Sequence, residues 1–169
     1  LVLGASLAER LSVDAVTGSG TVLVDVAADG SWSVVPVGFP APSDIVRMSG
    51  TTIRVHRLIA GRVQALLAAA SVDGIRLDGW GYRDAMSQIN LRRSHCGGSY
   101  EAVFTAPSSS CRPPTARPGH SMHERGLAVD FANCASRSTA CYRWLSTNAS
   151  RYGLFNLPSE PWHWSTNAH

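Results

Sequence analysis

The chain has no run of about 18 apolar residues, so the sequence predicts no transmembrane helix. It has no run rich in Lys or Arg either, and its net charge is only +3 with the histidines neutral. These features argue against a nucleic-acid partner. No internal repeat is visible. Hydrophobic residues make up 44% of the chain and charged residues 16%, a balance typical of a globular protein.

No CxxC motif occurs, which argues against a four-thiolate zinc site. The four cysteines lie at positions 96, 111, 134 and 141 and allow three pairings. We favour pairing of neighbours, Cys96 with Cys111 and Cys134 with Cys141, because it closes two short loops. Paired cysteines indicate a secreted protein or one of the cell envelope. Four reduced, buried thiols in a cytosolic protein are the alternative. The chain begins at Leu1 rather than Met, which fits a trimmed, mature form.

At 169 residues the chain can form one domain with an appendage. Residues 1–43 read as a β-rich appendage or spacer, in which the runs 21–26 and 32–37 form a hairpin around an Asp-Gly turn. Residues 44–169 read as the main domain. Its periodicity predicts helices over 54–70, 84–94 and 139–152, strands over 75–80, 127–131 and 155–164, and a long loop over 95–119. This order predicts an α+β fold with a small antiparallel sheet and flanking helices.

Two imidazoles and one carboxylate, from His123, Asp130 and His163, form a ligand set suited to zinc with one coordination position open. Glu160 lies three residues before the last of them and could act as a base on a metal-activated water. His123 and Asp130 are an odd number of residues apart, which on an unbroken strand would direct them to opposite faces. The chain must therefore bend between them, and Gly126 permits this.

The pair His123-Glu124 resembles the start of the helical zinc motif HExxH, but the motif fails. The position of its second histidine is occupied by Leu127, and Gly126 disfavours a helix. We therefore expect a ligand on a loop, His123, and a ligand on a strand, Asp130.

The pattern Ser121-x-His123-x-x-Gly126-x-Ala128-x-Asp130, followed by Glu160-x-x-His163, resembles the signature of VanY-type D-alanyl-D-alanine carboxypeptidases. These zinc peptidases of bacterial cell walls are related in fold to lysostaphin-type peptidases and hedgehog domains. The resemblance covers about residues 44–165. It implies a zinc site in a cleft on the sheet, with His123, Asp130 and His163 as Zn²⁺ ligands and Glu160 as the catalytic base.

The same resemblance extends to Gly81-Tyr82-Arg83 and to Gln88. It implies that Arg83 stabilises the oxyanion, as its permanent charge and forked donors allow. It implies that Ser121 binds the substrate, with the terminal carboxylate as its expected partner, and that Gln88 contacts the substrate more weakly. One of the two tryptophans that flank His163 is expected to line the cleft, and we assign this to Trp162.

The sequence therefore predicts a secreted zinc D,D-carboxypeptidase that hydrolyses the terminal D-Ala-D-Ala bond of peptidoglycan stem peptides. We expect a monomer with no nucleic-acid partner and no membrane span. Three alternatives stay open: a lytic peptidoglycan endopeptidase, a zinc-containing wall-binding domain without turnover, and a disulfide-stapled wall-binding module that holds no metal. The presence of both Glu160 and Arg83 argues against the second.

Overall fold

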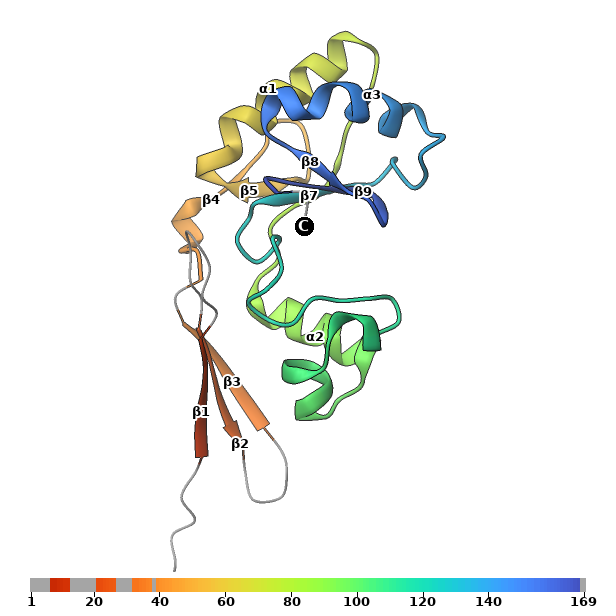
Figure 1. Ribbon diagram of the computed structural model, residues 1–169. Helices are drawn as coiled ribbons and strands as arrows, with labels where there is room; N and C mark the ends of the chain where they lie inside the picture. The colour runs from red at the N-terminus through yellow and green to blue at the C-terminus, as the bar shows by residue number, and fades with distance from the viewer. Residues whose placement is uncertain (1–6, 13–20, 27–31, 38, 168–169) are drawn as a thin grey trace, which may run out of the picture. The chain divides into compact units, whose positions relative to one another are not determined.

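The computed structural model describes residues 7–12, 21–26, 32–37 and 39–167. The chain divides into two compact units. One comprises residues 1–40 and 84–124, and the other residues 41–83 and 125–169. Both contain helices and antiparallel strands (Figure 1), so the predicted α+β class is confirmed.

The first unit begins with a three-stranded antiparallel sheet in the order β1-β2-β3, formed by β1 (Leu7–Ser12), β2 (Thr21–Val26) and β3 (Trp32–Val37). The predicted hairpin is thus confirmed as β2 and β3, while its Asp-Gly turn lies outside the described residues. Strand β1 was not predicted. Its sequence LAERLS contains two adjacent charged residues and no β-branched residue, so it carries little strand signal.

The first unit also contains α2 (Ala85–Cys96), which begins where the Asp84 side chain accepts a hydrogen bond from the Ser87 N–H at 2.7 Å. The following segment was predicted to be a loop without secondary structure. It instead contains η2 (Glu101–Thr105), a π-helix, and η3 (Ser108–Ser110), a 3₁₀-helix. The predicted Cys96–Cys111 disulfide joins the end of α2 to this segment.

A buried arginine of α2 holds that segment in place. The Arg92 guanidinium is fully buried and donates hydrogen bonds to the carbonyl oxygens of Ala102, Ala106 and Thr115. Burial lowers the pKa of Arg92 from its ordinary value, and Arg117 contributes to the same shift. The acceptors that satisfy this cation are backbone carbonyls, which fixes the path of the segment around it.

The second unit is built on a four-stranded antiparallel sheet in the order β6-β7-β9-β8. Its strands are β6 (Gly79–Trp80), β7 (Ala128–Phe131), β8 (Phe155–Leu157) and β9 (Glu160–Ser165). A short 3₁₀-helix, η1 (Pro42–Asp44), leads into a second sheet of two strands, β4 (Ile45–Arg47) and β5 (Arg54–His56).

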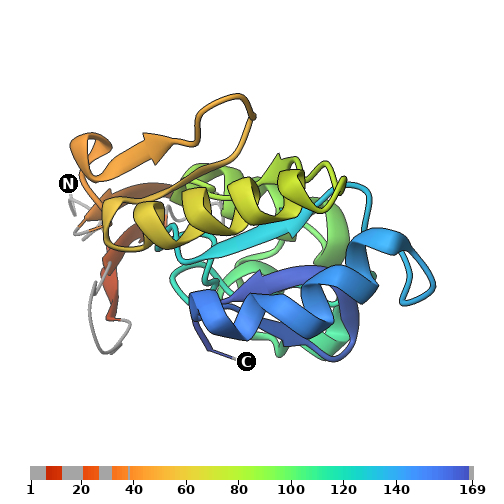
Figure 2. The same ribbon diagram turned by 90° about the horizontal axis from the view of Figure 1, so that it is seen from above.

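Helices α1 (Arg57–Val72) and α3 (Ala140–Asn148), the latter continued by the 3₁₀-helix η4 (Ala149–Tyr152), cover one face of the four-stranded sheet (Figures 1 and 2). The buried side of α1 packs in one core with Val129, Phe131 and Trp164 of the sheet. Residues Asp130 and His163 alternate with these along their strands, and so face away from the helices.

Three predicted elements have wrong bounds. The single strand predicted over 155–164 is instead two strands, β8 and β9, which pair with each other. The first helix begins at Arg57 rather than at residue 54, because residues 54–56 pair with β4, and the His56 ring nitrogen then caps the helix by accepting from the Leu58 N–H at 3.2 Å. The strand predicted over 75–80 is confined to β6, because only its last two residues pair with β7.

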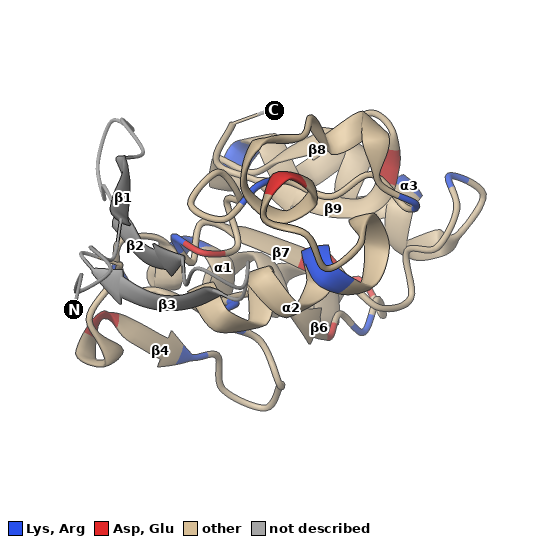
Figure 3. Cartoon of the chain, turned by 90° about the horizontal axis from the view of Figure 1, so that it is seen from below, with Lys and Arg blue, Asp and Glu red and all other residues tan. Residues whose placement is uncertain are grey.

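The second predicted disulfide, Cys134–Cys141, is also present. Within the described part of the chain, no helix has both the length and the apolar character needed to cross a membrane. Arginine and acidic positions are scattered over the described elements (Figure 3).

Candidate metal centre

Strand pairing brings Asp130 and His163 together. They lie directly opposite each other in the register of β7 and β9, so their side chains share one face of the sheet. The Asp130 Oδ1 and the His163 Nδ1 are 2.9 Å apart. His163 is buried and Asp130 is half-buried, so the pair is largely withdrawn from bulk water.

His123 completes a group of three. Each of His123, Asp130 and His163 offers one ligand atom, and these atoms all lie within 4.8 Å of one another. The bend predicted at Gly126 is confirmed, because this residue has a φ of +66°. A Cβ on Gly126 would lie 2.7 Å from the His56 nitrogen, whose N–H donates to the Gly126 carbonyl at 2.8 Å. Glycine is therefore required here both by conformation and by close packing.

The chemistry of this donor set fits a metal ion. Neutral imidazole nitrogens and a carboxylate oxygen are the donors found in zinc sites, and three protein ligands leave a position for water or substrate. The structure therefore contains a group that could hold a metal ion.

Glu160 is the first residue of β9 and is half-buried. The Asn156 side-chain amide donates to the Glu160 carbonyl at 2.9 Å and to the His163 carbonyl at 3.0 Å. One side chain therefore fixes both ends of the Glu-x-x-His segment, at a point where the pairing of β8 and β9 is irregular. Sequence reasoning missed Asn156, because nothing in the sequence shows that β8 lies beside β9.

Ser121 is buried, and its hydroxyl oxygen accepts a hydrogen bond from the His123 N–H at 3.3 Å. Glu124 is fully buried, and its carboxylate accepts from the Gly119 N–H at 2.8 Å and the Ser121 N–H at 3.2 Å. Sequence reasoning considered Glu124 only within the failed HExxH motif. The spacing Ser121-x-x-Glu124 is that of a capping box and could have predicted this contact.

Of the remaining predicted residues, Arg83 and Gln88 lie on other segments, and Trp162 lies on β9 with Glu160 and His163. Arg83 is half-buried and follows Tyr82, whose N–H donates to the Arg54 carbonyl at 2.6 Å. Gln88 is buried on α2, where its amide donates to the Ala116 carbonyl at 2.8 Å. Trp162 is 38% exposed on β9. Their predicted roles toward a substrate remain predictions.

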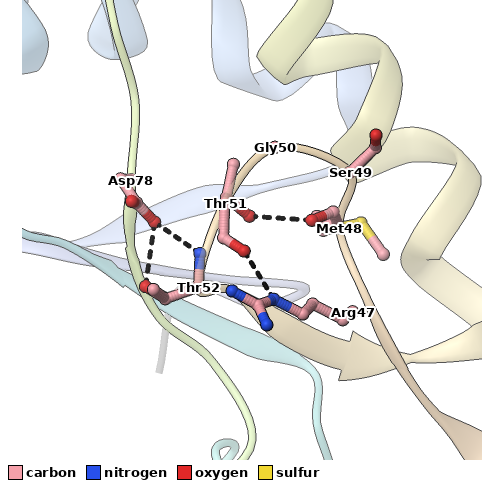
Figure 4. A pocket seen from close by; sticks show the side chains of 7 residues that line it. All are labelled: Arg47, Met48, Ser49, Gly50, Thr51, Thr52 and Asp78. Carbon is pink, nitrogen blue, oxygen red and sulfur yellow. Dashed lines mark hydrogen bonds between the residues drawn. The ribbon is translucent and has the colours of Figure 1, made fainter.

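A separate pocket of about 340 Å³ lies at the turn between β4 and β5 and contains none of the predicted site residues. Figure 4 shows Arg47, Thr51, Thr52 and Asp78 in its wall. The Asp78 carboxylate accepts from the Thr52 N–H at 2.9 Å and from the Thr52 hydroxyl at 3.0 Å. The Thr52 N–H holds the pKa of Asp78 below its ordinary value. These bonds stabilise the turn.

The chain resembles proteins of one known family. The family model of VanY, D-alanyl-D-alanine carboxypeptidase, matches residues 52–168. A search of curated proteins finds no match.

Solved structures also resemble the chain. A structure of VanYB in complex with D-alanine-D-alanine is 28% identical, with a TM-score of 0.56 over 76% of this chain and 81% of that chain. A mutant of the vancomycin resistance D,D-pentapeptidase VanY, from a VanB-type cassette and in complex with Zn(II), is 26% identical, with a TM-score of 0.53 over 77% and 83%. The LD-carboxypeptidase LdcB is 25% identical, with a TM-score of 0.56 over 75% and 69%.

The family match spans well over half of the chain and includes the His123, Asp130 and His163 group. The chain therefore belongs to the VanY family of D-alanyl-D-alanine carboxypeptidases and is a metallopeptidase of that type.

Proposed function

We propose that this chain is a zinc-dependent D,D-carboxypeptidase that removes the terminal D-alanine from peptidoglycan stem peptides ending in D-Ala-D-Ala. The observation that carries the proposal is the convergence of His123, Asp130 and His163 within 4.8 Å in a chain of the VanY family. The complexes of similar proteins with D-alanine-D-alanine and with Zn(II) support the choice of substrate and metal.

In this proposal His123, Asp130 and His163 hold the zinc ion. When bound, zinc supplies a Lewis acid that polarises the substrate carbonyl and makes water more acidic. The remaining chemistry belongs to side chains of the protein.

Glu160 is the proposed general base. It takes a proton from the water that attacks the carbonyl between the two D-alanines, and then gives that proton to the departing amine. The hydrogen bonds from Asn156 to the Glu160 and His163 carbonyls support this role, because they fix the backbone of the base relative to the backbone of a proposed ligand. Pro161 restricts Glu160 to an extended conformation, which limits where its carboxylate can point.

Arg83 is the proposed partner of the negative charge that develops on the carbonyl oxygen, because a guanidinium stays charged and offers forked donors. Ser121 is proposed to bind the substrate carboxylate. Its oxygen accepts from the His123 N–H, which leaves the hydroxyl proton able to donate. Trp162 is proposed to contact the substrate through the exposed part of its side chain. Gln88 of α2 is proposed as a weaker contact to the substrate, and its amide also donates to the Ala116 carbonyl.

We also propose that the enzyme works outside the cytoplasm. Its two disulfides support this location, because such bonds persist in oxidising compartments. The peptidase domain is proposed to comprise residues 44–169, and the family match from residue 52 to 168 lies within it. Residues 1–43 are then an appendage or spacer.

The test is release of free D-alanine from a pentapeptide ending in D-Ala-D-Ala, with the zinc content of each sample measured. We expect the wild type to release D-alanine with about one zinc per chain. Glu160→Ala should retain the zinc and lose roughly 10²- to 10⁴-fold in kcat, the range of general acid–base catalysis. Leu58→Ala, an exposed position on α1, is the matched control. Wild-type turnover equal to that of Glu160→Ala would refute the base assignment.

A second candidate is favoured by one observation, since the LD-carboxypeptidase matches with the same TM-score as VanYB. A tetrapeptide with a terminal L,D bond therefore belongs in the same assay, and faster cleavage of it would replace the D,D assignment. Intact cross-linked wall tests the endopeptidase alternative. Zinc binding without turnover of any of these substrates would indicate a wall-binding domain.

A further inference from the structure

A tryptophan outside the predicted site lies beside the metal ligands in the sheet. Trp80 on β6 is directly opposite Asp130 on β7, and Asp130 is directly opposite His163 on β9. Residues that face each other in antiparallel register share one side of a sheet, with Cβ atoms about 4.5–5.5 Å apart. Trp80, Asp130 and His163 therefore form a row on one face.

Trp80 differs from the aromatic residue of the neighbouring row. The side chain of Trp164 points to the other face and is buried beneath α1 and α3. Trp80 is 65% exposed, although an indole is one of the largest apolar surfaces that a protein can bury. A single exposed apolar residue needs no explanation by itself. This residue, however, lies opposite Asp130, a proposed metal ligand, where a bound substrate could reach it.

The backbone around Trp80 is held tightly on both sides. Gly79 packs against the Asp130 carbonyl, and Gly81 packs against the Arg54 carbonyl, so closely that neither position has room for a Cβ. The Tyr82 N–H then donates to the Arg54 carbonyl at 2.6 Å. The indole is therefore presented from a fixed backbone, which reduces the entropy lost when a ligand packs on it.

We propose that Trp80 is a specificity-determining residue of the enzyme. It packs against a C–H-rich surface of the substrate that lies outside the terminal dipeptide. An aliphatic side chain of the peptide and a sugar ring of the glycan offer this same chemistry. The inference rests on the proposed function, because it takes the row of Trp80, Asp130 and His163 to face a bound peptide.

The test compares kcat/KM on three substrates of increasing size: N-acetyl-D-Ala-D-Ala, a lysine-containing pentapeptide ending in D-Ala-D-Ala, and the same pentapeptide carrying N-acetylmuramic acid. We expect Trp80→Ala to leave the dipeptide within about twofold, and to lower kcat/KM on a larger substrate roughly three- to tenfold, the range of one aromatic contact. Trp80→Phe should retain most of the rate. Leu58→Ala removes an exposed apolar side chain on the helical side of the sheet. It should leave kcat/KM unchanged on all three substrates.

The substrate at which the loss first appears identifies the contact. A loss already present with the pentapeptide identifies its side chains, and a loss confined to the muramyl peptide identifies the sugar. An equal loss on all three substrates, or no loss on any, would overturn the inference.

Binding measured by calorimetry in a Glu160→Ala background separates this inference from the proposed function. If the wild type cleaves none of the three substrates, the D,D-carboxypeptidase proposal fails. Trp80 is then judged by affinity alone: weaker binding of the larger peptides on Trp80→Ala supports it, and unchanged binding refutes it.

Discussion

Replacing Gly126 with alanine tests how the bend between His123 and Asp130 is built. Two separate effects oppose the substitution. The φ of Gly126 is +66°, and a left-handed conformation costs an alanine roughly 1–2 kcal/mol. A new Cβ would also lie 2.7 Å from the His56 nitrogen and 3.0 Å from the Ile45 Cδ1. The nitrogen belongs to the backbone and cannot rotate away.

The expected magnitude follows from these two terms. Relief of the contact requires the Gly126 and His56 backbones to separate, which weakens a 2.8 Å hydrogen bond between them. Such a bond contributes about 1 kcal/mol. With the conformational strain, and with about 0.5 kcal/mol regained because alanine restricts the unfolded chain, Gly126→Ala should destabilise the protein by roughly 1.5–2.5 kcal/mol.

Gly74→Ala is the matched control. Gly74 has a φ of +72°, and no heavy atom lies within 4 Å of the point that a Cβ would occupy, so it carries the conformational cost without the contact. Urea unfolding should show Gly126→Ala to be less stable than Gly74→Ala by about 1 kcal/mol, the contribution of the weakened hydrogen bond. Zinc affinity should fall in Gly126→Ala alone. Equal destabilisation by the two variants would refute the argument that close packing at His56 fixes the bend.

Three further predictions concern other contacts. The pKa of Asp78 is lowered by folding from 3.8, so its stabilisation is present above that value and is lost as the pH falls through the folded pKa. Asp78→Asn should therefore cost about 1–2 kcal/mol at pH 7 in urea unfolding, and the difference from wild type should shrink below about pH 4. Arg92→Met should cost about 2–4 kcal/mol in the same assay, because it leaves buried carbonyl acceptors without a donor. Asn156→Asp places a carboxylate against the Glu160 and His163 carbonyls, so zinc affinity measured by chelator competition should fall roughly tenfold, and Asn156→Gln should fall less.

The ligand residues and most of the helices could be predicted from the sequence, because both are marked by local patterns. The apolar period of α1 and the Asp84 cap of α2 are readable within one turn of a helix. The strands that were missed or shortened depend on partners elsewhere in the chain. Residues 54–56 continue the helical pattern of α1 and yet pair with β4, so tertiary pairing overrides local preference there.

The burial of Glu124 and the place of Trp80 beside Asp130 were also not predicted from the sequence. Glu124 has the spacing of a capping box with Ser121, and its burial follows from the compact turn that it closes. The place of Trp80 beside Asp130 depends on which residues pair between β6 and β7. Those strands are separated by more than 40 residues of sequence, and no local pattern specifies their register.

Two pairs of residues in the proposed site have a spacing that regular strand geometry does not suit, and each is accommodated in a different way. His123 and Asp130 are separated by an odd number of residues, as are Glu160 and His163, and a regular strand would direct each pair to opposite faces. A left-handed glycine at position 126 re-aims the first pair. For the second pair, one step along β8 from Asn156 to Leu157 faces four steps along β9 from Trp164 to Glu160. Such an irregularity bends the strand and changes where its side chains point. The Asn156 amide fixes that bend by donating to the Glu160 and His163 carbonyls. Both ligand segments therefore depend on a local departure from regular strand geometry, so variants that restore regular geometry should lose metal affinity before they lose the fold.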